Sequence, residues 1–167
     1  MLGEYSTSGL FMEPIEYKNY ETFFESEINP LSKLTDELKR YHNSKDIILF
    51  NSGFWALVIA IKSKLDNSES KVVLLPSLTY RRLADAVYWA GGIPCFCDVE
   101  EETLALDKNI IFDYLKKNNS VGAIILVQPI VGSVDIDDYL LISENFSVPL
   151  IVDSVESVHD TINEKKC

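Results

Sequence analysis

The sequence predicts an α/β fold in three layers (α/β/α), with helices on both faces of a mainly parallel sheet. Short runs of consecutive apolar residues alternate with helix-like patterns along most of the chain. Such continuous apolar strands are typical of a sheet that is covered on both faces. The length of 167 residues and the 47% hydrophobic content suit one domain with a real core. We therefore expect an aromatic-rich arm over residues 1–29, followed by one domain over residues 30–167.

The first half of the chain combines two helix signals with two strand signals. Apolar residues recur at three- and four-residue steps after Pro30, a residue that suits the first turn of a helix. The run of residues 47–50 is short, apolar and bounded by polar residues, which predicts a buried strand. A strongly apolar stretch predicts a helix over 55–65, and the next apolar run predicts a strand over 72–75.

The second half repeats this alternation of helix and strand. A helix over about residues 80–90 is predicted to end at Gly91 and Gly92, since glycine commonly ends helices, and a strand over 93–99 follows. Asp107 and Asp135 can each cap a helix through the carboxylate, which predicts helices ending near residues 117 and 146. The remaining apolar runs predict strands over 123–127 and 148–152.

Composition and charge exclude several classes of function. Fifteen basic residues against 26 acidic ones give a net charge of −11, a surface that repels the phosphates of nucleic acids. No run reaches the roughly 18–20 apolar residues that span a bilayer. The first residues lack a secretory pattern, and the three cysteines lack zinc-site spacing. We therefore expect a cytoplasmic protein with reduced thiols, no metal site and no membrane contact.

Polar residues follow several of the predicted strands, and ligands of open α/β sheets bind beyond the carboxyl ends of the strands. The segment Asn51-Ser52-Gly53 leads directly into a helix, so it suits either a phosphate on its N–H groups or an ordinary N-cap. Asp153 closes the last strand and is the strongest single candidate. A carboxylate at the end of a buried strand needs a partner. The candidates for Asp153 are the N–H group of a helix that it caps, a metal ion, and the protonated nitrogen of a pyridine ring.

Three further candidates lie beyond the strand over 72–75. Tyr80 is placed either to lie flat on a planar ligand or to pack in the core. Arg81 and Arg82 follow it, and each suits either a carboxylate or phosphate ligand or the solvated surface of a helix. The sequence therefore leaves the roles of these three side chains open.

Four segments together share the order and spacing of motifs in one known family. They are Asn51-Ser52-Gly53-Phe54 before a helix, Pro76-Ser77-Leu78-Thr79-Tyr80, Gly92-Ile93-Pro94 followed by Asp98-Val99, and Asp153-Ser154-Val155-Glu156-Ser157. The chain resembles the DegT/StrS-type sugar aminotransferases, which depend on pyridoxal phosphate (PLP) and have the type I aminotransferase fold. The agreement extends from about residue 30 to residue 160.

The resemblance implies part of the large domain of such an enzyme and a site for PLP. It also implies a nucleotide-linked keto-sugar as the substrate class and a homodimer as the assembly. The ring of the cofactor would act as an electron sink. The matching cofactor-binding residues are Ser52, Gly53 and Phe54 at the phosphate, Tyr80 on the pyridine ring, Asp153 at the ring nitrogen and Glu156 near the ring hydroxyl.

Two departures from the family pattern bear on activity. Phe54 stands where the family has Thr or Ser, which removes a hydroxyl from the phosphate site. The family's Schiff-base lysine belongs to a segment beyond Cys167, and Lys165 and Lys166 occupy a charged tail that does not match it. We therefore expect no catalytic residue among these 167, and a chain that is inactive unless a complementary C-terminal chain or a longer gene product supplies the lysine.

Two alternatives remain at the level of the sequence. One is a non-catalytic truncated relative that binds a partner protein or a sugar nucleotide, which Phe54 favours. The other is an unrelated α/β domain of the receiver or Rossmann type. In that case Asp98 and Asp153, both at strand ends, would bind Mg²⁺.

Overall fold

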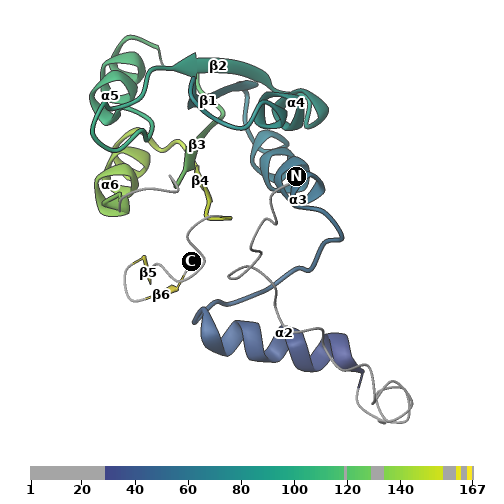
Figure 1. Cartoon of the computed structure of the whole chain (residues 1–167). Helices are drawn as coiled ribbons and strands as arrows, with labels where there is room; N and C mark the ends of the chain where they lie inside the picture. The colour runs from purple at the N-terminus through teal and green to yellow at the C-terminus, as the bar shows by residue number, and fades with distance from the viewer. Residues whose placement is uncertain (1–28, 119, 129–133, 156–160, 163–164, 167) are drawn as a thin grey trace, which may run out of the picture.

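A parallel sheet of four strands forms the centre of the molecule (Figure 1). The computed structural model describes residues 29–118, 120–128, 134–155, 161–162 and 165–166. The strand order is β2-β1-β3-β4, and every neighbouring pair is parallel. Four of the five predicted strands and the α/β fold class are therefore confirmed. The strands are β1 (Val72–Pro76), β2 (Ile93–Cys97), β3 (Ala123–Val127) and β4 (Leu150–Asp153).

Helices cover both faces of this sheet, which gives the three layers. One face carries α3 (Gly53–Leu65) and α4 (Arg82–Trp89), and the other carries α5 (Lys108–Lys117) and α6 (Ile136–Phe146) (Figure 1). Successive side chains of a strand point to opposite faces. Accordingly, Val73 and Leu75 join the core under α3 and α4, whereas Leu74 joins the core under α5 and α6. Burial on both faces explains why the strand runs are continuously apolar.

Local capping fixes where these helices begin and end. The Asp107 carboxylate accepts hydrogen bonds from the N–H groups of Asn109 and Ile110 at 2.8 and 3.3 Å, as its predicted N-cap role requires. Asp135 likewise accepts from Asp137 N at 3.0 Å and begins α6. Gly91 follows α4 with φ +80°, a conformation that residues with a Cβ rarely adopt. The two aspartate caps and the glycine end of α4 are therefore confirmed.

The strand predicted over residues 47–50 is wrong. This segment has no regular secondary structure, and its apolar side chains are largely exposed: Ile48 by 74%, Leu49 by 41% and Phe50 by 40%. A strand is held by hydrogen bonds to a neighbouring strand. Within the described part of the chain, β1 and β3 have strands on both sides and none lies beside residues 47–50. An apolar run alone therefore did not produce a strand.

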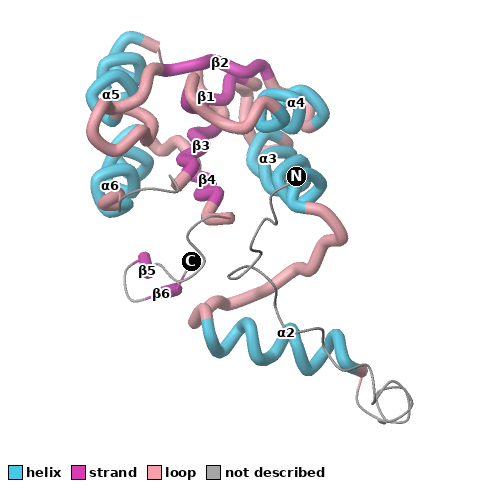
Figure 2. The backbone as a smooth tube through the Cα atoms, viewed as in Figure 1, coloured by secondary structure: helices cyan, strands magenta, loops and turns pink. Residues whose placement is uncertain are grey.

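The helix predicted after Pro30 is confirmed, as α2 (Pro30–Tyr41), but it is not buried. The Asn29 side chain caps it by accepting a hydrogen bond from Leu31 N at 3.0 Å. Figure 2 shows α2 standing apart from the α/β body. Its apolar positions remain open to solvent, with Leu31 exposed by 62% and Leu34 by 46%. Periodicity thus predicted the helix correctly, although none of its residues is buried in the described structure.

The ends of the chain are described only in part. Residues 1–28, which make up nearly all of the predicted arm, lie outside the described residues. Beyond β4, the short strands β5 (Thr161–Ile162) and β6 (Lys165–Lys166) pair antiparallel. Among the described helices, none combines the length and the hydrophobicity needed to cross a membrane.

Replacement of Tyr139 by Phe is expected to lower the free energy of unfolding by about 1–2 kcal/mol. Tyr139 is buried in α6, and its hydroxyl donates to the Leu106 carbonyl oxygen at 2.5 Å. Burial raises the pKa of this phenol well above its usual value, so it remains a neutral donor. The variant leaves the carbonyl without this donor. Urea unfolding would measure the loss, with Tyr88→Phe as the control, because Tyr88 is 76% exposed and should show no change.

Candidate functional site

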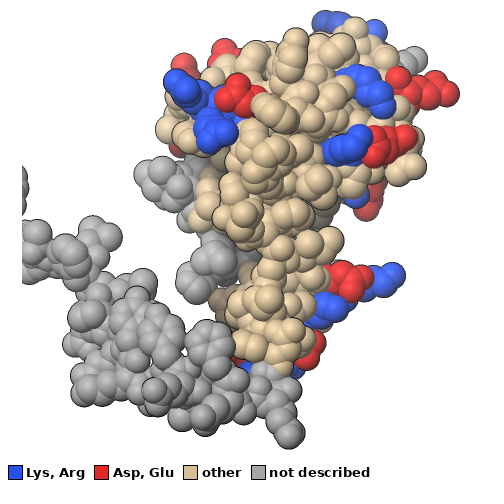
Figure 3. Space-filling view, turned by 90° about the vertical axis from the view of Figure 1, so that its right-hand side faces the viewer, with Lys and Arg blue, Asp and Glu red and all other residues tan. Residues whose placement is uncertain are grey.

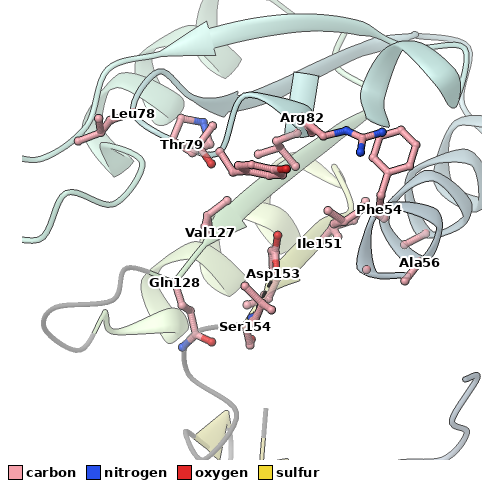
Figure 4. Close-up of a pocket in the computed structure, with 18 of the residues that line it drawn as sticks. Phe54, Ala56, Leu78, Thr79, Arg82, Val127, Gln128, Ile151, Asp153 and Ser154 are labelled. Atoms are coloured by element: carbon pink, nitrogen blue, oxygen red, sulfur yellow. Dashed lines mark hydrogen bonds between the residues drawn. The ribbon is translucent and has the colours of Figure 1, made fainter. Parts of the chain in front are cut away.

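A cavity of about 1110 Å³ lies beyond the carboxyl ends of β1, β3 and β4 (Figure 4). Its wall includes Gly53 and Phe54 from the start of α3, Tyr80 and Arg82 from the start of α4, and Asp153 from the end of β4. Much of the remaining wall is apolar. The structure thus brings together four of the six predicted site residues, Gly53, Phe54, Tyr80 and Asp153, in one cavity.

The first turn of α3 presents an open backbone to this cavity. Ser52 is the N-cap residue, with extended backbone angles (φ −157°, ψ 131°), and its side chain makes no capping hydrogen bond. The first N–H groups of a helix have no intrahelical partners, and the helix dipole makes this end attractive to anions. A Cβ added at Gly53 would meet no atom within 4 Å. The start of α3 therefore has space for an anionic group, and Ser52, its N-cap, is not among the described wall residues.

The Arg82 side chain packs over the aromatic ring of Phe54. The Arg82 guanidinium carbon lies 4.3 Å from the centre of the Phe54 ring, so a side chain from α4 crosses to the first turn of α3 (Figure 4). The sequence left open whether Arg81 or Arg82 faces a ligand. Both side chains are exposed, but Arg82 lines the cavity and Arg81 is absent from its described wall. The sequence alone could not show which of the two arginines faces the cavity, because that depends on the residue at which α4 begins.

Tyr80 lies in the cavity wall and not in the core. Its side chain is 71% exposed, which excludes the core-packing role that the sequence had left open. The residue precedes α4 directly, and its carbonyl oxygen accepts from Leu83 N at 2.9 Å. This contact anchors the backbone while the ring stays accessible. A planar ligand in the cavity can therefore reach the Tyr80 ring.

Asp153 brings the carboxylate into the cavity from the end of β4. It pairs in register with Val127 of β3, and its carbonyl oxygen accepts from Gln128 N at 2.9 Å. One carboxylate oxygen also accepts from Val155 N at 3.4 Å. The side chain is half-buried, so its charge interacts with a ligand in a medium less polar than bulk water. Glu156, the remaining predicted site residue, lies outside the described residues.

The arrangement of the strands disfavours the magnesium alternative. Asp98 follows β2 and Asp153 ends β4, and these are the two outer strands of the described sheet. At about 4.8 Å per strand, three spacings separate them by roughly 14 Å, which is too far for one ion. No group of three metal-ligating side chains occurs within the described residues.

The two described cysteines on β2 are free and lie outside the cavity wall. Cys97 is buried, and burial together with the neighbouring Cys95 thiol raises its pKa to about 11. A thiol with such a pKa stays protonated at neutral pH and is a poor nucleophile. These observations agree with the packing role expected from the sequence. Leu104, from the loop after β2, does line the cavity, although no sequence signal had pointed to it.

The fold is that of PLP-dependent enzymes. The E. coli GDP-4-keto-6-deoxy-D-mannose-3-dehydratase with bound hydrated PLP superposes with a TM-score of 0.79 at 18% identity, over 98% of this chain and 44% of that one. Helicobacter pylori PseC, an aminotransferase of pseudoaminic acid biosynthesis, gives a TM-score of 0.72 at 18% identity, over 84% and 38% of the two chains. Residues 23–167 match the DegT/DnrJ/EryC1/StrS aminotransferase family, and the chain belongs to this family.

Curated relatives agree with this assignment. The UDP-4-amino-4,6-dideoxy-N-acetyl-beta-L-altrosamine transaminase of Campylobacter jejuni (serotype O:2) is 27% identical over 124 residues, which are 74% of this chain and 32% of the relative. The spore coat polysaccharide biosynthesis protein SpsC of Bacillus subtilis is 25% identical over 129 residues, or 77% and 32% of the two proteins. The chain thus spans about a third of the length of these relatives. The family resemblance inferred from four sequence segments is confirmed.

Proposed function

We propose that this chain forms the cofactor-binding part of a PLP-dependent aminotransferase that acts on a nucleotide-linked keto-sugar. The observation that carries the proposal is the single cavity that gathers Gly53, Phe54, Tyr80 and Asp153. Membership of the aminotransferase family supports the class of reaction. The substrate class is supported by the Campylobacter jejuni relative, whose name describes a transaminase of a UDP-linked amino sugar.

The residues of the wall fit PLP by charge and shape. The open N–H groups at Gly53 and Phe54 suit the dianionic phosphate, and the missing Cβ at Gly53 leaves it room. The accessible Tyr80 ring suits stacking on a planar heterocycle. Asp153 suits a protonated ring nitrogen, because a carboxylate beside that nitrogen favours its charged form. When bound, PLP supplies an electron sink for the carbon that carries the amino group.

A polypeptide of these 167 residues is expected to bind PLP without attaching it to a particular lysine. The described wall of the cavity contains no lysine. Within the described residues, the proposed site therefore has no amine that would hold the cofactor covalently and move protons. Borohydride reduction followed by peptide mass spectrometry would test this expectation. One lysine labelled one-to-one, with the label lost when that lysine is replaced, would contradict it.

A non-catalytic role in binding is the second candidate function, and Phe54 is the observation that favours it. The ring occupies the position of the family's phosphate-binding hydroxyl and contacts Arg82 at 4.3 Å. A protein that binds sugar nucleotides without the cofactor has no need for that hydroxyl. Titration of the chain with a UDP-sugar, with and without PLP, separates the two functions. Tight binding of the UDP-sugar together with undetectable binding of PLP would favour the non-catalytic role.

A partner surface and a cytoplasmic location complete the proposal. Figure 3 shows a broad uncharged area on the side of the molecule where α3 and α4 lie. Exposed aromatic rings occur on both helices, including Trp55 (43%) and Trp89 (68%), whose ring centres are 5.7 Å apart. Large exposed apolar areas commonly mark protein interfaces. This face suits a second subunit or a complementary C-terminal chain, and the free Cys95 and Cys97 suit a reducing compartment.

A further inference from the structure

Two charged side chains face the cavity within the described part of its wall, and they have opposite signs. Arg82 enters from α4, whereas Asp153 comes from the end of β4 (Figure 4). The other described wall residues carry no formal charge. PLP also has one anionic end, its phosphate, and one cationic point, its protonated ring nitrogen. If Asp153 faces the ring nitrogen, as proposed above, then Arg82 is the cation left for the phosphate.

The position of Arg82 places its charge beside the first turn of α3. The guanidinium lies over the Phe54 ring at 4.3 Å, and Phe54 is the second residue of that helix. Within the described residues, no carboxylate forms a salt bridge with Arg82. Contact with an aromatic face holds a guanidinium in place while leaving its N–H groups free at the edge of the plane. The Phe54 ring therefore orients Arg82 without consuming its hydrogen-bond donors.

We propose that Arg82, oriented by Phe54, binds the cofactor phosphate and replaces the hydroxyl that the family has at position 54. This inference rests on the proposed PLP site. A guanidinium offers paired N–H donors that match a phosphate in geometry and charge, and such charge-assisted bonds are stronger than a bond from a neutral hydroxyl. In this proposal, Phe54 supplies no phosphate ligand itself but orients Arg82, which does. Arg82 is a binding residue in this account and takes no part in proton transfer.

The test compares PLP with pyridoxal, which lacks the phosphate, on the full chain. Quenching of tryptophan fluorescence gives both dissociation constants. We expect Arg82→Gln to weaken PLP binding by roughly 10- to 100-fold, the factor that corresponds to a charge-assisted hydrogen bond, and to leave pyridoxal binding unchanged. Arg82→Lys should retain part of the affinity, because it keeps the charge and loses the paired geometry. Arg81→Gln is the matched control and should change neither constant.

A second variant tests the support by Phe54. Phe54→Leu keeps an apolar side chain and removes the ring, so the guanidinium is no longer held over the helix start. We expect PLP binding to weaken several-fold, again without an effect on pyridoxal. Thermal unfolding of every variant without ligand verifies that the fold is retained. If Phe54→Leu binds PLP as tightly as the unmodified chain, the orienting role is wrong.

The remaining outcomes separate the inference from the proposed function. If Arg82→Gln weakens PLP and pyridoxal equally, or weakens neither, the phosphate role of Arg82 is overturned while the PLP site stands. If the unmodified chain binds neither compound, the proposed function fails, and this inference fails with it. If Arg82→Gln weakens binding of a UDP-sugar and the unmodified chain ignores PLP, Arg82 serves a nucleotide phosphate and the inference is overturned.

Discussion

Replacement of Asp153 by Asn is expected to weaken binding of PLP by roughly 30-fold or more. Asparagine has nearly the same shape and keeps an oxygen for the hydrogen bond from Val155 N. It removes only the negative charge that faces the protonated ring nitrogen in the proposed site. Loss of one partner from a hydrogen-bonded charge pair costs about 2 kcal/mol or more when the pair is shielded from water, which corresponds to that factor.

The measurement uses two ligands, PLP and an analogue in which a CH group replaces the ring nitrogen. The analogue has no charge at that position, so Asp153→Asn should scarcely change its dissociation constant. Asp113→Asn is the matched control, because Asp113 is exposed on α5 and does not line the cavity. Equal weakening of both ligands by Asp153→Asn would show that the carboxylate shapes the cavity and does not pair with the ring nitrogen.

Replacement of Gly122 by Ala is expected to lower the free energy of unfolding by about 2–3 kcal/mol. Gly122 directly precedes β3 and is buried. A Cβ there would lie 2.4 Å from the Ser70 carbonyl oxygen and 2.6 Å from a methyl carbon of Leu65. The backbone has little freedom to move away, because Gly122 N donates to Val72 O at 2.7 Å and the Ser70 hydroxyl donates to Ser120 O at 2.8 Å.

The control for this prediction is a glycine-to-alanine substitution at a position where the added methyl group meets no other atom. Gly53→Ala adds a methyl group that meets nothing within 4 Å, so it should leave the free energy of unfolding almost unchanged. Gly92→Ala should fall between the two, since its Cβ would meet Val87 at 2.9 Å and Leu65 at 3.0 Å. Urea unfolding of the three variants gives the order directly. A Gly122→Ala chain as stable as the Gly53→Ala chain would refute the argument.

Features set by neighbours in the sequence were predicted well. The caps at Asp107 and Asp135 involve a carboxylate and N–H groups two or three residues away, so the local sequence contains both partners. The buried strands β1 and β3 were found because covering both faces of a sheet requires nearly continuous apolar runs. The helix after Pro30 was found from its apolar spacing.

Features set by distant parts of the chain were not predictable in the same way. The apolar run over residues 47–50 lacks a neighbouring strand among the described residues, and its strand was predicted wrongly for that reason. The choice between Arg81 and Arg82 depends on the exact start of α4 and on the Phe54 ring, which lies 28 positions earlier in the chain than Arg82. The exposure of Tyr80 depends on the cavity that three strands and two helices form together.

The sequence by itself determined the α/β fold, the family and the order of the candidate site residues, because these depend on local pattern and on motifs in register. Only the tertiary structure decided that Gly53, Tyr80 and Asp153 share one cavity and that Arg82 faces it. The physical reason is that parallel strands bring their carboxyl ends to one edge of a sheet, so residues up to 100 positions apart meet there.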